Sequence, residues 1–488
     1  MDFLSLKFGI FLAIMAFANY VLPGRLRVPG LLAGSLVFYY MGAARFLPLL
    51  LALCLVTYIF GWLLGKFRKN YVYFLGVCCI LTALVYFKYA AFLVGLADRL
   101  LHFGAGETLL RLGDVIAPLG ISFMTFQAIS YLGDIYYGKI TPEKNPALVA
   151  LQVCFFPNVT SGPIQKARDF IPQMKRKAVF DYDLVRHGLL LFAFGGLQKY
   201  YISDKLAPMI DAMQSALIRE PGHGGFHYMF FAFAYAVYIY ANFNSYSDMA
   251  IGIAKILGVR FSANFRRPYL STSIKEFWQR WHISLNSWFV EYVYIPLGGS
   301  HKGKLRYYLN ILAVFFLSGL WHGASLHFIA WGLLNGFYQI FGNITAGFRR
   351  KVYSLLKVDP ASGFAIAWKR FCVFFLIGIS WIFFTIPGTR LSMKMALSMV
   401  FPPVMTLFDG WILTQFDTVF SALSLLGTIA VFAWIQCGRE KESLSTRLAQ
   451  QPAVIRYGVY VLAAVLLMFG YVGTFTGNGN GGFVYGNF

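Results

Sequence analysis

The chain has 488 residues, of which 58% are apolar and only 13% are charged, and its mean hydropathy is +0.61. Soluble domains carry nearer one quarter charged residues, so these values exclude a soluble globular protein, and the abundance of apolar residues excludes a disordered one. The net charge of +22 comes from basic residues in short segments between apolar runs. This distribution is typical of positive-inside topology with attraction to anionic membrane lipids, and no further feature supports nucleic-acid binding.

Apolar runs long enough to cross about 30 Å of hydrocarbon recur along the whole chain. They predict an all-α polytopic membrane protein with about eleven transmembrane helices. The predicted spans are 4–22, 28–44, 46–65, 71–95, 115–137, 226–247, 305–326, 327–346, 364–387, 418–437 and 453–475. Shorter apolar pieces at 147–165, 187–201 and 396–415 predict re-entrant, tilted or partial segments.

Basic residues indicate the orientation of the first spans. Arg25 and Arg27 follow the first span, and Lys66 to Lys69 follow the third, which predicts two cytoplasmic loops and an external N-terminus. The first apolar run lacks a basic leader and a small-residue cleavage site, so we expect a retained span rather than a signal peptide. The glycine-rich end at 477–482 predicts an irregular tail.

Two regions, 138–186 and 248–306, interrupt the pattern of spans and are rich in basic residues. Loops of this length in a compact protein are usually functional. Irregular backbone at membrane depth must be buried in protein or line a wet cavity. We therefore expect re-entrant or interfacial helices on the cytoplasmic side in both regions.

His322 is the clearest candidate for chemistry, because an ionisable side chain within an apolar span is costly and marks function by default. On one helix, Ser318, His322 and Ser325 would form a polar stripe. Gly319 and Gly323 lie four residues apart, a spacing that permits close helix approach or a narrow passage. A neutral imidazole at this position would serve as a general base. The alternative is a structural histidine hydrogen-bonded between helices.

A second histidine, His282, lies in the segment 274–289, which predicts an amphipathic helix. On a continuous helix, the residues on the apolar face would be Trp278, His282, Leu285 and Phe289, and those toward another face would be Lys275, Gln279 and Asn286. An interfacial helix with a satisfied histidine explains the pattern equally well. The cations that would contact the phosphates of a cytosolic donor are Lys275, Arg280, Arg266 and Arg267, although a solvated basic face is the simpler interpretation.

Other candidate sites are weaker. His223 and His227 lie four residues apart with Glu220 nearby, which could indicate zinc ligands. The alternative is that they belong to an ordinary external loop without a metal. The six cysteines show no zinc spacing, so no metal site is predicted. Asp134 and Asp248 are expected to be buried hydrogen-bonding or capping residues.

Six segments together carry a family resemblance. They are Pro118–Gln127, Phe156–Ile164, Tyr246–Gly252, Phe277–Leu285, Tyr294–Gly299 and Gly319–Gly323. In this combination and order the chain resembles the membrane-bound O-acyltransferase (MBOAT) family, and more closely its bacterial alginate O-acetylation (AlgI-like) branch. The resemblance covers roughly 30–345 and is weaker over the C-terminal helices of 346–488.

The resemblance implies one integral-membrane domain over 1–488, with helices around a central tunnel that joins the two membrane faces. It implies that His322 matches the central catalytic histidine of the family and that His282 matches its second key position. Ser318 matches a serine of the sterol and diacylglycerol acyltransferases. The remaining candidates for substrate or donor binding are Trp321, Trp281, Asn286, Ser325, Arg280 and Lys275.

The implied reaction begins with an acyl thioester, acetyl-CoA or a carrier-bound donor, that enters from the cytoplasm with no bound cofactor in the protein. His322 takes a proton from an acceptor hydroxyl as that hydroxyl attacks the thioester carbonyl. Ser318 or His282 hydrogen-bonds the oxyanion or orients the acceptor. In this branch the acetyl group passes across the bacterial cytoplasmic (inner) membrane to an extracytoplasmic polysaccharide acetyltransferase or polymer-export complex.

Two alternatives to O-acetylation of an exported polysaccharide remain. One is D-alanyl transfer from a small acidic carrier protein to a cell-envelope polymer, which a carrier encoded nearby would indicate. The other is a transporter or channel in which the polar stripe conducts a substrate. A transporter predicts activity that survives His322→Ala, whereas both enzyme interpretations predict its loss.

Overall fold

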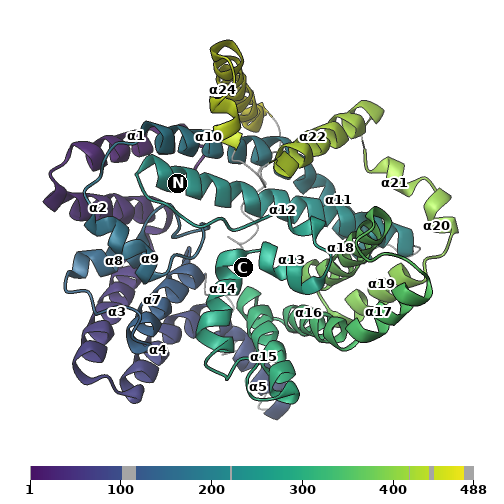
Figure 1. The fold of residues 1–488 in the computed structure, drawn as a ribbon, viewed down its shortest axis with the longest axis horizontal. Helices are drawn as coiled ribbons and strands as arrows, with labels where there is room; N and C mark the ends of the chain where they lie inside the picture. Colours follow the sequence, from purple (N-terminus) through teal and green to yellow (C-terminus); the bar gives the residue numbers. More distant parts are fainter. Residues whose placement is uncertain (1, 102–116, 220–222, 417, 439–443, 477–488) are drawn as a thin grey trace. The chain divides into compact units, whose positions relative to one another are not determined.

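The computed structural model describes residues 2–101, 117–219, 223–416, 418–438 and 444–476. Within these ranges every regular element is a helix (Figure 1), as the composition predicts. The chain forms two compact units. Unit 1 comprises residues up to Ala193 together with Tyr246–Ala263, and unit 2 comprises Phe194–Ser245 and the residues from Asn264 onward. The expectation of a single domain over 1–488 stays a prediction.

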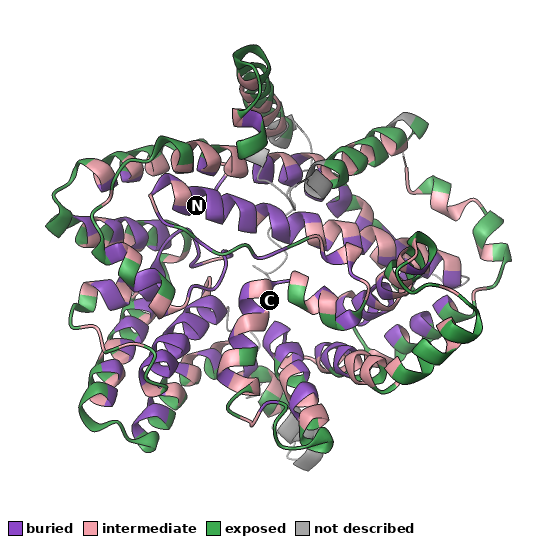
Figure 2. Cartoon of the chain, viewed as in Figure 1, coloured by how far each residue is buried: buried purple, intermediate pink, exposed green. Residues whose placement is uncertain are grey.

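Unit 1 is built around α7, whose residues from Ile121 to Ile135 are all buried (Figure 2). Helices α3 and α4 pack against α7 and against each other, and α2 packs against α8. The helices of this unit are α1 (Leu6–Val21), α2 (Gly24–Ala43), η1 (Ala44–Phe46), α3 (Leu47–Phe67), α4 (Asn70–Leu84), η2 (Val85–Tyr89), α5 (Ala90–Leu101), α7 (Ile121–Tyr136), α8 (Pro146–Cys154), α9 (Ala167–Lys175) and most of α10 (Tyr182–Gln198).

Buried polar contacts join α7 to neighbouring segments of unit 1. The side-chain amide of Gln152 donates to the backbone carbonyl of Gln127 at 3.3 Å. The Asp134 carboxylate is fully buried and pairs with Arg168 at 3.5 Å and with Lys139 at 3.8 Å. A buried carboxylate is tolerated only when it is paired in this way. The prediction that Asp134 is a buried bonding residue is confirmed.

Unit 2 contains most of the second half of the chain, and α12 begins in unit 2 and ends among residues of unit 1. Its helices are η4 (Lys199–Ser203), α11 (Asp204–Arg219), α12 (Gly225–Ile256), η5 (Pro268–Leu270), α13 (Ile274–Arg280), α14 (Ile283–Phe289), η6 (Val290–Tyr294), α15 (Lys304–His322), α16 (Leu326–Ile344), α17 (Ala346–Leu355), α18 (Gly363–Thr385), α19 (Thr389–Val400), α20 (Met405–Phe408), α21 (Trp411–Thr414), α22 (Val419–Gly438), α23 (Leu444–Ala449) and α24 (Ala453–Thr476).

Helices α15 and α16 form a tightly packed antiparallel hairpin. A Cβ atom on Gly319 would lie 2.3 Å from the carbonyl oxygen of Phe328, and one on Gly332 would lie 2.2 Å from that of Phe315. The two backbones therefore approach more closely than any other residue type allows. The expectation of close helix approach at Gly319 is confirmed.

The prediction that one helix carries Ser318, His322 and Ser325 is wrong only beyond His322. Helix α15 ends at His322 because Gly323 is extended, with φ −173° and ψ 153°. Ser325 is also extended and occupies the N-cap position of α16. Ser325 therefore does not continue the stripe of Ser318 and His322 on one helix.

The predicted continuous helix over 274–289 is also wrong, because it is divided into α13 and α14. Between them His282 has a left-handed backbone, with φ 45° and ψ 54°. The cause is competition for the backbone groups at the break. The N–H of Arg266 bonds the carbonyl of Arg280 at 2.9 Å, and the N–H of Ile283 bonds the carbonyl of Asn264 at 2.8 Å. The preceding loop thus takes the bonds that would have continued the helix.

Four helical stretches are long and apolar enough to cross a membrane: Gly24–Phe67, Asn70–Gly95, Gly363–Thr385 and Ala453–Gly473. Large apolar side chains are exposed over most of the length of the last of these, and Figure 2 colours much of this helix, α24, as exposed. Exposed apolar side chains on a helix of this length are suited to contact with lipid. The predicted piece at 396–415 is broken between α19, α20 and α21, as expected of a partial segment. The count of about eleven crossings stays a prediction.

Candidate active site

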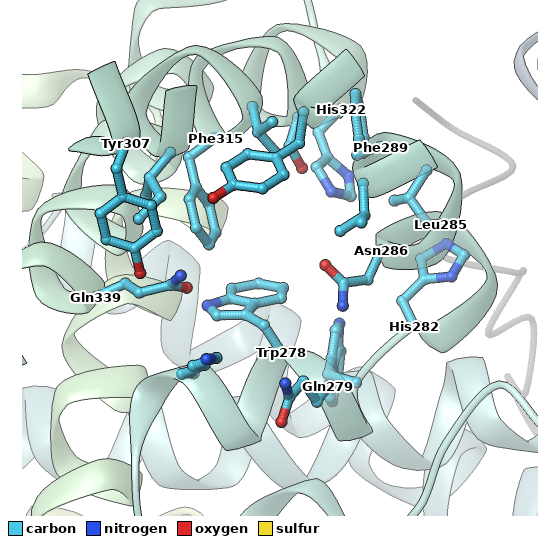
Figure 3. Close-up of a pocket in the computed structure, with 17 residues that line it drawn as sticks. Trp278, Gln279, His282, Leu285, Asn286, Phe289, Tyr307, Phe315, His322 and Gln339 are labelled. Atoms are coloured by element: carbon cyan, nitrogen blue, oxygen red, sulfur yellow. The ribbon is translucent and has the colours of Figure 1, made fainter. Parts of the chain in front are cut away.

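A cavity of about 230 Å³ lies within unit 2, with walls from α13, α14, η6, α15 and α16. Both candidate histidines line it, although they are far apart in the sequence (Figure 3). The other predicted site residues on its wall are Ser318, Trp281, Asn286 and Lys275. The structure therefore brings most of the candidate site together around one cavity.

His322 is held at the end of α15 by aromatic side chains from three helices. Its ring centroid lies 4.7 Å from that of Trp321, 4.9 Å from that of Trp331 on α16 and 5.1 Å from that of Phe384 on α18. His322 is 3% exposed, and Ser318 lies one turn before it on the same wall. Such close packing limits the movement of the imidazole ring.

His282 is 2% exposed and lies at the break between α13 and α14. Its Nδ1 atom is 3.1 Å from Oδ1 of Asn264, and its ring packs edge-on against Phe243 at 4.6 Å between centroids. A left-handed backbone at a residue other than glycine costs free energy, and such strain gathers at functional sites. Burial lowers the pKa of His282 to about 3, so that this imidazole is neutral at physiological pH.

A capping box sets the start of α13 and thereby the direction of Trp278 and Lys275. The Ser273 hydroxyl accepts from the N–H of Glu276 at 3.1 Å. The Glu276 carboxylate accepts in return from the N–H of Thr272 at 2.7 Å. The first bond satisfies an N–H of the first helical turn, and the second fixes the chain just before the N-cap residue.

A glycine turn links η6 to α15 on the other side of the cavity. Gly298 and Gly299 have φ angles of 101° and 56°, which favour glycine. The side-chain amide of Asn310 donates to the Gly299 carbonyl at 2.8 Å and holds this turn against α15. The segment Tyr294–Gly299 is thus explained by a turn that places Tyr294 on the cavity wall.

The cavity has a second polar wall that the sequence reasoning did not assign. Figure 3 shows Tyr307 and Gln339 on the side of the cavity opposite His282 and His322. Trp278 lies between these two sides. Within the described part of the chain the buried indole N–H of Trp278 has no hydrogen-bond partner. The Tyr307 oxygen accepts from the Asn343 amide at 2.9 Å, which leaves its own proton to donate elsewhere. A polar stripe on α16, Asn335, Gln339 and Asn343 at four-residue spacing, was the signal that could have found this wall.

Three predicted binding residues lie off the cavity wall. Trp321 packs behind the site, with its ring centroid 6.2 Å from that of His282. The Arg280 guanidinium is 2.6 Å from the Glu276 carboxylate on its own helix. Ser325 belongs to the connection before α16. Lys275 is therefore the predicted cation that the structure places at the cavity.

The His223 and His227 pair forms a separate contact in unit 2. The two Nδ1 atoms are 3.3 Å apart, and Nε2 of His227 lies 2.9 Å from the carboxylate of Asp409. In the described ranges no group of three or more potential ligand side chains is arranged around a metal position. The absence of a metal site stays a prediction.

Comparison with known proteins gives the family. Residues 149–386 match the model of the membrane-bound O-acyltransferase family, and this range includes both histidines. The chain is 32% identical to the probable alginate O-acetylase AlgI of Azotobacter vinelandii, over 80% of this chain and 76% of that protein. The chain belongs to the membrane-bound O-acyltransferase family. It is therefore a membrane protein and an acyltransferase of the AlgI-like branch.

Two further relatives of the chain are named for other polymers. It is 30% identical to the peptidoglycan O-acetyltransferase of Helicobacter pylori, over 82% of this chain and 78% of that protein. It is also 30% identical to the teichoic acid D-alanyltransferase of Bacillus subtilis, but over only 45% of this chain and 57% of that protein. The wider coverage lies with the O-acetylating members of the family.

The neutral, buried His282 predicts a loss of stability in acid. Its pKa falls from an ordinary 6.5 to about 3 on folding, so the unfolded chain takes up the proton first as the pH falls. The contribution of the neutral His282 to the free energy of unfolding is therefore fully present above pH 6.5. Below that pH it declines by about 1.4 kcal/mol per pH unit. We expect the melting midpoint in detergent to fall more in wild type than in His282→Gln between about pH 7.5 and about pH 5. Equal falls in the two proteins would contradict a buried neutral imidazole.

Proposed function

We propose that this protein transfers an acetyl group from a cytoplasmic thioester to a hydroxyl acceptor, for O-acetylation of an exported polysaccharide. The observation that carries the proposal is the single cavity that both His322 and His282 line. Membership of the acyltransferase family and the wide similarity to O-acetylating relatives support the acetyl group and the polymer.

The proposed chemistry needs one group that accepts a proton and one group that donates a hydrogen bond to the oxyanion. His322 takes the proton of the acceptor hydroxyl while the hydroxyl oxygen attacks the thioester carbonyl. The Ser318 hydroxyl, one turn before His322, donates a hydrogen bond to the oxyanion that forms. The carbon–sulfur bond then breaks, and the imidazolium returns its proton to the thiolate. The products are the acetyl ester and a free thiol, so no covalent acyl-enzyme is required.

The polar wall opposite the histidines is suited to the arm of the donor. Acetyl-CoA and carrier thioesters present the same pantetheine arm, which carries secondary amides. The Trp278 N–H and Tyr307 hydroxyl would donate to an amide carbonyl, and Gln339 would accept from an amide N–H. Lys275 would attract the phosphate at the far end of the arm.

The side of the protein from which the thioester donor enters is proposed to face the cytoplasm. The membrane is proposed to be the bacterial inner membrane. The proposed partner is an extracytoplasmic polysaccharide acetyltransferase or a polymer-export complex that receives the acetyl group. Basic segments between the spans support the orientation, because such residues accumulate on the cytoplasmic side.

The test is acetyl transfer by protein reconstituted in proteoliposomes, with labelled acetyl-CoA outside and a hydroxyl-bearing saccharide inside. We expect thioester consumption and label on the internal saccharide, both dependent on the protein. Empty liposomes and liposomes with a folded His322→Gln variant are the controls. Thioester that stays intact in a well-folded preparation, with and without a carrier-bound acetyl donor, would contradict the proposal.

The second candidate is D-alanyl transfer, which the similarity to the teichoic acid D-alanyltransferase favours. The same proteoliposomes would be given a D-alanyl carrier protein and acetyl-CoA in competition. Labelled D-alanine on the acceptor without labelled acetate would replace the first proposal with the second.

A further inference from the structure

Asn264 binds three consecutive residues at the start of α14. Its backbone carbonyl accepts from the N–H of Ile283 at 2.8 Å, and its side-chain oxygen accepts from the N–H of Ser284 at 3.2 Å. The first N–H groups of a helix have no partner within the helix. His282 is the N-cap residue of α14, but its side chain makes no capping bond. Asn264 therefore caps this helix from the preceding loop. The His282 side chain is not needed as a cap, and it lines the cavity.

The contacts of Asn264 also determine which nitrogen of His282 carries the proton. A backbone N–H can only donate, so the atom of Asn264 facing Ser284 is the carbonyl oxygen Oδ1. The same Oδ1 is 3.1 Å from His282 Nδ1. An amide oxygen cannot donate, and hence the proton between them must belong to Nδ1. A neutral imidazole carries only one such proton, and Nε2 then retains its lone pair.

Burial and hydrogen bonds hold the Asn264 side chain in the orientation that sets this tautomer of His282. Asn264 is 1% exposed and Ser284 is 6% exposed. The Ser284 hydroxyl lies 3.0 Å from the same Oδ1 and donates to it as well. Rotating the Asn264 amide would place its NH2 group against the Ser284 N–H, which has no lone pair to offer. The oxygen is therefore held toward His282 by the backbone of α14.

We propose that Asn264 is a positioning residue that holds His282 in the Nδ1–H tautomer, so that Nε2 acts only as a hydrogen-bond acceptor in the cavity. This inference rests on the proposed function, in which His282 and His322 share one reaction site. In this tautomer His282 cannot stabilise an oxyanion. Its Nε2 receives a hydrogen bond from a second hydroxyl of the saccharide acceptor, beside the one that reacts at His322, and thereby orients the acceptor. The oxyanion is left to Ser318.

The experiment is 15N NMR of histidine-labelled protein in nanodiscs, combined with steady-state transfer rates. The chain has eight histidines, so the signal of His282 can be assigned as the one missing from His282→Gln. We expect a protonated Nδ1 in wild type, although free histidine prefers the proton on Nε2. Asn264→Asp keeps an accepting oxygen, and Nδ1 should stay protonated. In Asn264→Ala the proton should move to Nε2, and kcat should fall about 10- to 100-fold with little change in KM for the thioester.

Asn310→Ala is the matched control, because Asn310 is also a buried asparagine that bonds backbone carbonyls but lies off the cavity wall. It should lower stability without moving the proton of His282. An Nε2–H signal for His282 in wild type would overturn the proposal, even where Asn264→Ala fails to fold. An unchanged Nδ1–H signal in Asn264→Ala would overturn it too. If wild type shows the Nδ1–H tautomer but transfers no acetyl group, the proposed function fails while the positioning role stands.

Discussion

Replacing His322 with glutamine is expected to reduce acetyl transfer by about 10²- to 10⁴-fold, the usual contribution of a general base. Glutamine keeps a similar volume and hydrogen-bonding capacity but cannot take up a proton. The ring contacts of His322 with Trp331 and Phe384 are partly retained by a side chain of this length, so the protein should fold. The measurement is thioester turnover by purified protein, with size exclusion and thermal melting as checks of folding.

His327→Gln is the matched control for that variant. His327 lies on α16, four residues before Trp331, and its Nδ1 is 3.1 Å from the carbonyl oxygen of Phe383. It is half-buried but does not line the cavity. Turnover in His327→Gln should stay within a few-fold of wild type, since a glutamine amide can still donate to that carbonyl. Turnover of His322→Gln equal to that of His327→Gln would remove His322 from the chemistry.

Gly319→Ala is expected to destabilise the hairpin of α15 and α16 by about 1–3 kcal/mol, through overpacking. The added methyl group would lie 2.3 Å from the Phe328 carbonyl oxygen, and backbone cannot yield as the end of a flexible side chain can. The helices must separate, and His322 at the end of α15 moves with them. We expect a lower melting midpoint and a loss of turnover together.

Gly342→Ala is the control for Gly319→Ala. It tests whether the loss of stability comes from the close backbone contact or from replacing any glycine in these helices. Gly342 also lies in α16, but a Cβ there meets no atom within 4 Å. Alanine favours a helix over glycine by about 1 kcal/mol, so this variant should be neutral or more stable. A similar loss of stability in both variants would show that close backbone approach at Gly319 is not what holds the hairpin.

Local patterns indicated both histidines that line the cavity, but the reason given for His282 was incomplete. His322 stands out because an ionisable side chain in an apolar run is rare for a physical cause. His282 was placed on a continuous amphipathic helix, whereas the chain breaks there. Helical periodicity could not reveal the break, because the competing bonds come from Asn264 and Arg266 in the preceding loop.

The second wall of the cavity was overlooked for a related reason. Gln339 and Asn343 lie in an apolar span where their spacing was a usable signal. Tyr307 gave no such signal, since aromatic residues are abundant along the whole chain, and Trp278 was placed on the face of His282 without a polar role. The sequence did not show that Arg280 pairs with Glu276 one turn away and lies off the cavity wall, and its role at the donor phosphate stays a prediction.

The sequence by itself determined the class of this protein and its family. Low charge and long apolar runs require helices that satisfy their own backbone in lipid, and the ordered motifs specify an acyltransferase. Only the tertiary structure decided which residues share the cavity and which nitrogen of His282 carries its proton. Those properties depend on contacts between different elements, such as the loop residue Asn264 with His282 and Gly319 of α15 with Phe328 of α16, and local residue spacing does not encode them.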